Sequence, residues 1–212
     1  MRLLAVVAAV ALAGCGGSSG TKTTSEAPKK MDRTKPPEDY RVRFETTLGP
    51  FVVEVTRAWA PRGADRFFEL VQGKFYDGAR FFRVKPKFVV QFGISPDPKT
   101  NELWRQLRFP DDPVKQSNLR GYISYATDGP NTRTTQVFIN LVDNKKLDAR
   151  GFSPFGKVTE GMEAVDKFYS YGEVQSLGGG GPDTAKMETL GDEYIQRGFP
   201  RMDQIKTARV IE

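Results

Sequence analysis

The chain has 212 residues, 38% of them hydrophobic and 15 of them Phe, which is enough for the core of one domain of ordinary size. It contains no His and one Cys, which excludes imidazole catalysis, imidazole metal ligands, an internal disulfide and a cysteine-cluster zinc site. The net charge of +6 is mild, and acidic residues are interspersed with basic ones, so no basic stripe indicates a nucleic-acid partner.

Residues 1–14 are typical of a secretory signal peptide, with a positive start, a short apolar run and small residues before Cys15. The run is too short to span a membrane as a helix. Leu12-Ala13-Gly14-Cys15 resembles the bacterial lipobox, which implies cleavage before Cys15 and a lipid on it. We therefore expect a bacterial envelope lipoprotein, on the periplasmic side of the outer membrane in a Gram-negative cell and otherwise on the outer face of the plasma membrane. The alternative is an ordinary signal peptide with an incidental Cys.

Residues 15–39 follow the signal and are rich in Gly, Ser, Thr, Lys and Pro, with almost no apolar side chains. Such a segment cannot bury enough apolar surface to offset the entropy lost on ordering. We predict that it is a disordered tether between the lipidated Cys15 and a folded domain over residues 40–212.

The domain opens with a predicted β-hairpin, formed by an alternating run at 41–47, a turn at 48–50 and an extended run at 51–56. A helix is predicted next, because Pro61 suits a first helical turn and apolar residues follow at helical spacing up to Gly73. A second hairpin is predicted from the β-prone runs 80–84 and 88–93, which Pro86-Lys87 separates.

The second hairpin concentrates polar and apolar side chains. Alternation along a strand predicts that Phe81 and Arg83 share one face and that Val89 and Gln91 share one, with Phe88 at the rim. This arrangement would place a donor-rich patch beside an apolar patch. The alternative, from the hairpin alone, is a solvated Arg beside a core Phe.

The remaining chain predicts further strands and helices. A helical turn is expected at 102–108, strands at 121–126, 136–141, 152–158 and 204–211, and helices at 160–169 and 184–196. Residues 173–182 hold a Gly run and are predicted to be a mobile loop; they lack the Lys of a phosphate-binding loop. About eight strands with two or three helices favour an antiparallel barrel with helices at its ends.

Three blocks of sequence resemble, in order and spacing, the signature blocks of cyclophilins: Phe81–Gly93, Ser124–Asn140 and Leu147–Val158. The segment WAPRGADRFFELVQGKFYDG looks like that family's first helix, and the resemblance covers roughly residues 41–212. It implies a mainly β fold, a closed eight-stranded antiparallel barrel capped by two helices. It also implies peptidyl-prolyl cis–trans isomerase activity without cofactor or metal.

The same resemblance implies roles for individual residues. Arg83 falls at the family's catalytic arginine, and Gln91 can hold it in place. The positions that line the proline pocket hold Phe88, Val89, Phe138 and Leu147. The positions that contact the peptide backbone and the groove hold Gln91, Ala126 and Gln136.

Four positions depart from the family pattern: Phe82 replaces a His, Val89 a Met, Thr127 an Asn that bonds the peptide, and Lys146 a Trp found in many eukaryotic members. We expect these changes to affect affinity and inhibitor response more than the reaction, which needs no proton transfer. The region 172–200 is longer than in compact members, and the sequence assigns it no role.

The function predicted is isomerisation of X-Pro bonds in envelope or exported proteins. The protein is expected to be a monomer whose partners are proline-containing polypeptides. The alternative is a proline-peptide binding or scaffold lipoprotein with weak or no catalysis, which the changed residues Val89, Thr127 and Lys146 favour. A solute-binding lipoprotein is disfavoured, because the chain is too short for two lobes and lacks their repeating βα pattern.

Overall fold

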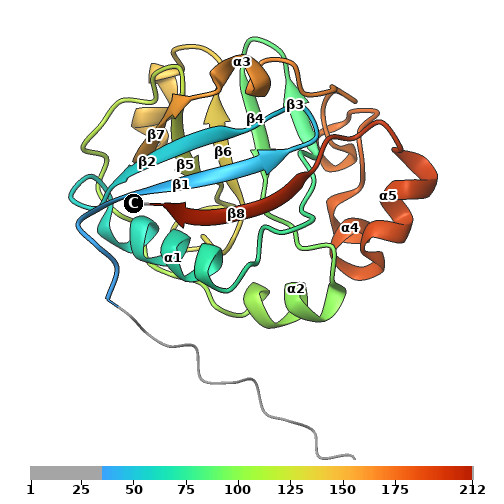
Figure 1. Ribbon diagram of the computed structural model, residues 1–212, viewed down its shortest axis with the longest axis horizontal. Helices are drawn as coiled ribbons and strands as arrows, with labels where there is room; N and C mark the ends of the chain where they lie inside the picture. Colours follow the sequence, from blue (N-terminus) through green and yellow to red (C-terminus); the bar gives the residue numbers. More distant parts are fainter. Residues whose placement is uncertain (1–34, 212) are drawn as a thin grey trace, which may run out of the picture. The chain divides into compact units, whose positions relative to one another are not determined.

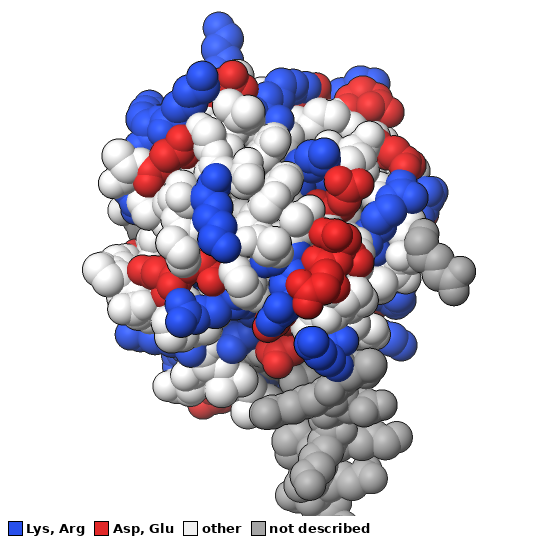
Figure 2. Space-filling model, turned by 90° about the vertical axis from the view of Figure 1, so that its left-hand side faces the viewer, with Lys and Arg blue, Asp and Glu red and all other residues white. Residues whose placement is uncertain are grey.

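The computed structural model describes residues 35–211, so the predicted signal peptide, Cys15 and most of the predicted tether lie outside the described residues. Within 35–211, none of the helices is long and apolar enough to cross a membrane. On the face shown in Figure 2, acidic and basic side chains are interspersed, and this face therefore carries no patch of a single sign.

The described residues form eight strands in one antiparallel sheet (Figure 1). The strands are β1 (Asp39–Thr46), β2 (Phe51–Thr56), β3 (Arg83–Lys85), β4 (Val89–Phe92), β5 (Tyr122–Tyr125), β6 (Val137–Asn140), β7 (Pro154–Glu160) and β8 (Ile205–Ile211). Their order across the sheet is β3-β4-β6-β5-β7-β2-β1-β8. The predicted hairpins at 41–56 and 80–93 are confirmed as β1–β2 and β3–β4.

The sheet is curled into an open half-barrel, and the prediction of a closed barrel is wrong. Strands β3 and β8 are its two edges and form no ladder with each other. Strand β3 is only three residues long and begins at Arg83. The chain before it meets the start of β8 through one isolated bridge, Arg80 to Gln204, and flanking hydrogen bonds such as Ile205 N to Ala79 O at 2.8 Å. The edges therefore approach each other without completing a ladder.

The first hairpin illustrates how alternation builds the core. Tyr40, Val42 and Phe44 of β1 are buried while their neighbours are partly exposed. Phe44 lies opposite Phe51 of β2, and the two rings stack with centroids 4.6 Å apart. Gly49 has a φ of 114°, which favours glycine in the turn that joins the strands.

The helices are α1 (Pro61–Gln72), α2 (Pro98–Arg105), α3 (Met162–Val165), α4 (Thr184–Leu190) and α5 (Asp192–Gly198), with short 3₁₀ turns η1 (Lys145–Arg150) and η2 (Gln175–Leu177). Helix α1 begins at Pro61 and ends before Gly73, as predicted. The helix predicted at 160–169 is a single turn, and the one predicted at 184–196 is two helices. Gly191 separates them at a φ of 65°, where a Cβ would lie 2.5 Å from Pro96 O.

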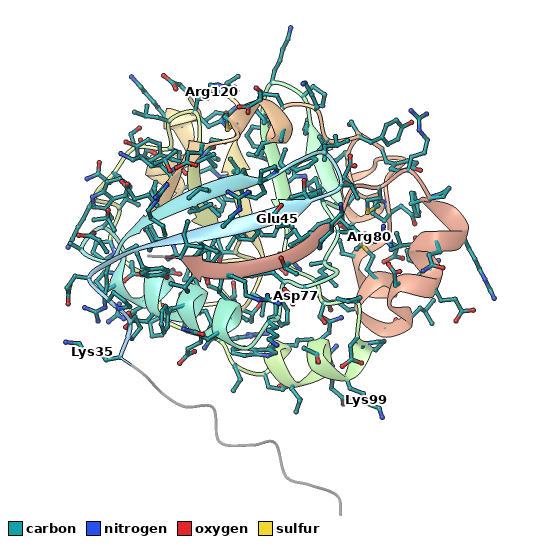
Figure 3. All side chains as sticks on the ribbon, viewed as in Figure 1. Lys35, Glu45, Asp77, Arg80, Lys99 and Arg120 are labelled. Atoms are coloured by element: carbon teal, nitrogen blue, oxygen red, sulfur yellow. The ribbon has the colours of Figure 1, made fainter. Side chains whose placement is uncertain are left out.

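Region 172–200 folds over the end of the sheet and forms a second, smaller core together with residues outside it. The buried residues of this core are Phe82, Ile94, Val174, Met187, Ile195, Phe199 and Met202. Arg80 lies between the sheet and helices α4 and α5 (Figure 3), and its guanidinium pairs with Asp192 at 2.9 and 3.0 Å. Phe82 is therefore buried against the added region, which explains why this position holds an apolar ring in place of the family's His.

Candidate functional site

A buried apolar cluster lies where β4, β6 and η1 meet. Val89, Phe138 and Leu147 form it, and Phe88, Ala126 and Phe152 pack against it from less buried positions. The rings of Phe138 and Phe152 meet edge to face at 5.5 Å. Strand pairing brings the first two residues together, because β4 and β6 are neighbours with Gln91 opposite Phe138. The cluster therefore brings together the four residues that were predicted to line a proline pocket, and it gives them a common apolar surface.

This cluster forms part of a groove of about 1090 Å³. All the predicted catalytic and substrate-binding residues line it: Arg83, Phe88, Val89, Gln91, Ala126, Thr127, Gln136, Phe138 and Leu147. Sequence reasoning did not include the wall contributed by the added region, which is formed by Val174, Ser176, Leu177, Thr184 and Glu188. A smaller hollow of about 350 Å³, between the β1–β2 turn and α3, holds none of the predicted site residues.

A hydrogen-bonded chain of side chains runs along the groove. Arg83 of β3 lies directly opposite Gln91 of β4. Arg83 Nη1 donates to Gln91 Oε1 at 3.0 Å, and Gln91 Nε2 donates to Gln136 Oε1 at 3.0 Å. Gln91 and Gln136 thus hold each other and the guanidinium. The predicted shared face of Val89 and Gln91 is confirmed, since both line the groove.

The predicted shared face of Phe81 and Arg83 is wrong. Phe81 precedes β3, so strand alternation does not extend to it. Its ring is buried in the main core and stacks on Phe168, with centroids 3.8 Å apart. Each of the two predictions for this hairpin is thus partly right. Phe81 is a core residue, as the alternative had it, while Arg83 faces the groove, as the donor-rich patch required.

Arg83 has a second partner that the sequence did not indicate. Glu173, from the added region, accepts hydrogen bonds from Arg83 Nε at 2.5 Å and from Nη2 at 2.9 Å. Lys85 Nζ lies 3.2 Å from the same carboxylate. Burial opposes ionisation of this carboxyl, but the hydrogen bonds and charges of Arg83 and Lys85 outweigh it and hold the pKa of Glu173 below its ordinary value. The carboxylate is therefore ionised at neutral pH.

The rim of the groove is polar around Phe88. The cations of Arg83, Lys85 and Lys146 lie 5.7 to 5.8 Å from the centre of its ring. Lys146 is exposed. Thr127 uses its hydroxyl within its own loop, donating to Gly129 O and lying 2.9 Å from the hydroxyl of Thr132.

The 3₁₀ turn that carries Leu147 into the pocket is fixed from behind. Asp148 Oδ1 accepts from Asn118 N at 2.9 Å and from Asn118 Nδ2 at 2.8 Å, and Oδ2 accepts from Ser117 Oγ at 2.5 Å. Burial raises the pKa of Asp148, but these hydrogen bonds more than offset it, and the pKa lies below its ordinary value. This carboxylate anchors the turn and thereby holds Leu147 in place.

Known proteins are similar to this chain in sequence and in fold. The family model for cyclophilin-type peptidyl-prolyl cis-trans isomerase matches residues 41–187. A peptidyl-prolyl cis-trans isomerase of Acinetobacter baylyi is 35% identical over 140 residues, covering 59% of this chain and 70% of the relative. One of Arabidopsis thaliana is 35% identical over 147 residues, covering 66% and 84%.

The crystal structure of a Cryptosporidium parvum cyclophilin-type isomerase has a TM-score of 0.61 against this structure at 20% identity, covering 82% of this chain and 98% of that one. A second structure of that protein, obtained in the presence of the dipeptide Ala-Pro, has a TM-score of 0.58 and covers 81% of this chain. These likenesses show a common fold.

Proposed function

The chain belongs to the cyclophilin-type peptidyl-prolyl cis-trans isomerase family and has its activity, and we propose that Arg83, held by Gln91, is the residue that lowers the barrier. The observation that carries this proposal is the placement of a held guanidinium beside the apolar cluster within one groove. The other predicted site residues are proposed to bind the peptide on either side of the proline.

Rotation about a peptide bond costs about 18–20 kcal/mol because amide resonance is lost, and X-Pro bonds rotate unaided in tens to hundreds of seconds. The reaction breaks no bond. It requires only that the twisted amide, whose nitrogen regains its lone pair, be stabilised more than either planar form. In our proposal, the Arg83 guanidinium donates to the twisted amide while Val89, Phe138 and Leu147 hold the proline ring.

The test compares isomerisation with binding for one proline-containing peptide. The full-length chain should accelerate cis–trans exchange over buffer and should bind the peptide saturably. Saturable binding without acceleration would instead favour a proline-peptide scaffold. The cyclophilin-type structure obtained in the presence of Ala-Pro supports a proline-containing ligand for the groove. We propose that the natural substrates are X-Pro bonds in envelope or exported proteins.

We further propose that residues 1–14 are a signal peptide, that residues 15–39 tether a monomeric domain, and that the source is bacterial. The lipobox-like sequence before Cys15 supports a lipid anchor, which a change of this residue removes. Cys15→Ser protein is expected to leave the membrane fraction, while the isomerase rate of the exported domain stays the same. Fractionation followed by detection of the chain measures this. Cys15→Ser protein that stays in the membrane fraction after export would show that the anchor is not a lipid on Cys15.

The rim residue Lys146 leads to a prediction about inhibitors. In the family, cyclosporin lies across the substrate groove, and a Trp at the rim donates its indole N–H to it. Lys146 lacks the flat apolar area of an indole, and its ammonium resists desolvation. We expect cyclosporin affinity to be about ten- to a hundred-fold weaker than in a Trp-bearing member, a loss of about 1–3 kcal/mol.

Lys146→Trp should partly restore inhibition, as measured by titrating cyclosporin into the isomerase assay. Lys145→Trp is a matched control, because Lys145 is an exposed residue of the same turn and the cation over the Phe88 ring comes from Lys146. Nanomolar inhibition of the unmodified chain would contradict the prediction and would indicate that Phe152, which lines the groove, supplies the aromatic surface.

A further inference from the structure

We propose that Glu173 is a positioning residue for isomerisation, which fixes the guanidinium of Arg83 from the side opposite Gln91. The inference rests on the proposed function, since it requires Arg83 to be the catalytic residue. It gives a role to the added region 172–200, which supplies Glu173 together with one wall of the groove.

Some N–H groups of the Arg83 guanidinium are hydrogen-bonded within the protein, and others are free to bond a substrate. Arginine has five N–H groups. Nε and Nη2 donate to Glu173 and Nη1 donates to Gln91, so three N–H groups are used and two remain for a substrate. The side chains of Arg83 and Glu173 are each only 16% exposed, which limits competition by water. A donor held by a bidentate carboxylate and an amide has few alternative rotamers, and preorganised donors are those that stabilise a transition state.

The backbone of Glu173 is itself fixed by the glycine run. Glu173 O accepts from Gly181 N at 2.8 Å, and Gly179 N donates to Val174 O at 3.1 Å. A Cβ on Gly179 would lie 1.9 Å from Glu173 O, and one on Gly181 would lie 2.8 Å from it. The glycine run at 178–181 is thus packed against the backbone of Glu173, and position 179 has room only for glycine. A Cβ on Gly180 would meet nothing within 4 Å.

The other end of the Glu173 segment is attached to β3, the strand that carries Arg83. Ser170 Oγ donates to Val84 O, and Gly172 forms an isolated bridge with Val84. Lys85 adds a second cation to the carboxylate. Because both sides of the segment are attached, Glu173 acts as a fixed support and not as a flap that must leave before substrate enters.

The experiment measures the isomerisation rate at saturating peptide and the peptide dissociation constant for the full-length chain. A small misplacement of a catalytic group costs up to about a hundred-fold in rate. Glu173→Ala is expected to lower kcat about ten-fold with a change of about two-fold or less in the dissociation constant. Glu173→Gln, which keeps an acceptor oxygen, should recover part of the rate. Glu193→Ala is the matched control, because Glu193 is a paired carboxylate in the same region whose partner Arg197 is exposed.

Two further comparisons separate positioning from a general structural effect. In an Arg83→Ala background, Glu173→Ala should have no further effect on kcat, because the residue acts through Arg83. Gly179→Ala should lower kcat in the same way as Glu173→Ala, whereas Gly180→Ala should leave it unchanged.

Each possible result bears on the proposal. An unchanged or raised kcat in Glu173→Ala would overturn the proposal. So would an equal loss of kcat when Glu173→Ala is made in the unmodified chain and in the Arg83→Ala background. If Arg83→Ala itself keeps full activity, the proposed catalytic role of Arg83 fails as well. If Arg83→Ala is inactive while Glu173→Ala is fully active, only the role of Glu173 is refuted.

Discussion

Replacing Arg83 by Ala is expected to lower the isomerisation rate about 10²–10³-fold, by analogy with the loss of one oxyanion donor, which costs about 2.7–4 kcal/mol of barrier lowering. The substitution removes the charged donor in the groove that is held on two sides. The apolar cluster is left intact, because Arg83 is not one of its members. Peptide binding should therefore weaken much less than catalysis. An isomerase assay at several peptide concentrations separates the two effects.

Two variants control this result. Arg83→Lys keeps the charge but cannot donate to Glu173 from two nitrogens while bonding Gln91, so it should restore only a small part of the rate. Arg43→Ala removes an exposed arginine that pairs with Glu45 on β1, and its rate should equal that of the unmodified chain. Full activity in Arg83→Ala, with the fold intact by circular dichroism, would refute the mechanism.

Local pattern was sufficient to predict the part of the site that lies on one hairpin. Val89 and Gln91 alternate within a single strand, so their shared face follows from strand geometry. The other pocket residues, Phe138 and Leu147, come from separate segments. Their placement beside Val89 required the family resemblance, because no local rule gives the order of strands in a sheet.

The failures have identifiable physical causes. Phe81 lies outside β3, so extending the alternation by two residues placed it on the wrong face. Helices α4 and α5 were merged because the helical pattern does not show the close approach of Gly191 to Pro96 O. Glu173 was missed because it lies 90 residues from Arg83 in sequence, and an acidic residue beside a glycine run has no local signature.

Arg133 is predicted to be one of the residues on which the stability of the domain most depends. Its side chain is 2% exposed, and its Nη2 donates to Gly151 O at 2.6 Å, at the end of η1. Its Nε lies 3.0 Å from Asp111 Oδ1. Its backbone forms an isolated antiparallel β-bridge with Phe109. Burial lowers the pKa of Arg133, which the nearby carboxylates of Asp111 and Asp112 oppose.

Arg133→Ala is therefore expected to lower the free energy of unfolding by about 2–5 kcal/mol, the usual cost of truncating a large buried side chain to Ala. The change removes a large buried side chain and leaves Asp111, whose own side chain is 35% exposed, without its cation. Denaturant unfolding of the full-length chain measures the loss. Arg197→Ala is the control, since that side chain is 80% exposed and its pair with Glu193 should contribute about 1 kcal/mol or less.

A double substitution identifies which part of this cost is electrostatic. Arg133→Met fills part of the space but leaves Asp111 unpaired, so it should remain strongly destabilising. Adding Asp111→Asn removes the unpaired charge, while its side chain can still accept the hydrogen bond from Asn131 N that Asp111 Oδ2 accepts at 3.0 Å. The double variant should therefore be more stable than Arg133→Met alone. Equal stability of the single and the double variant would mean that packing and the hydrogen bond to Gly151 O account for the loss, and not the charge of Asp111. Arg133 would then act mainly as a link between the loop before β6 and the turn that carries Leu147.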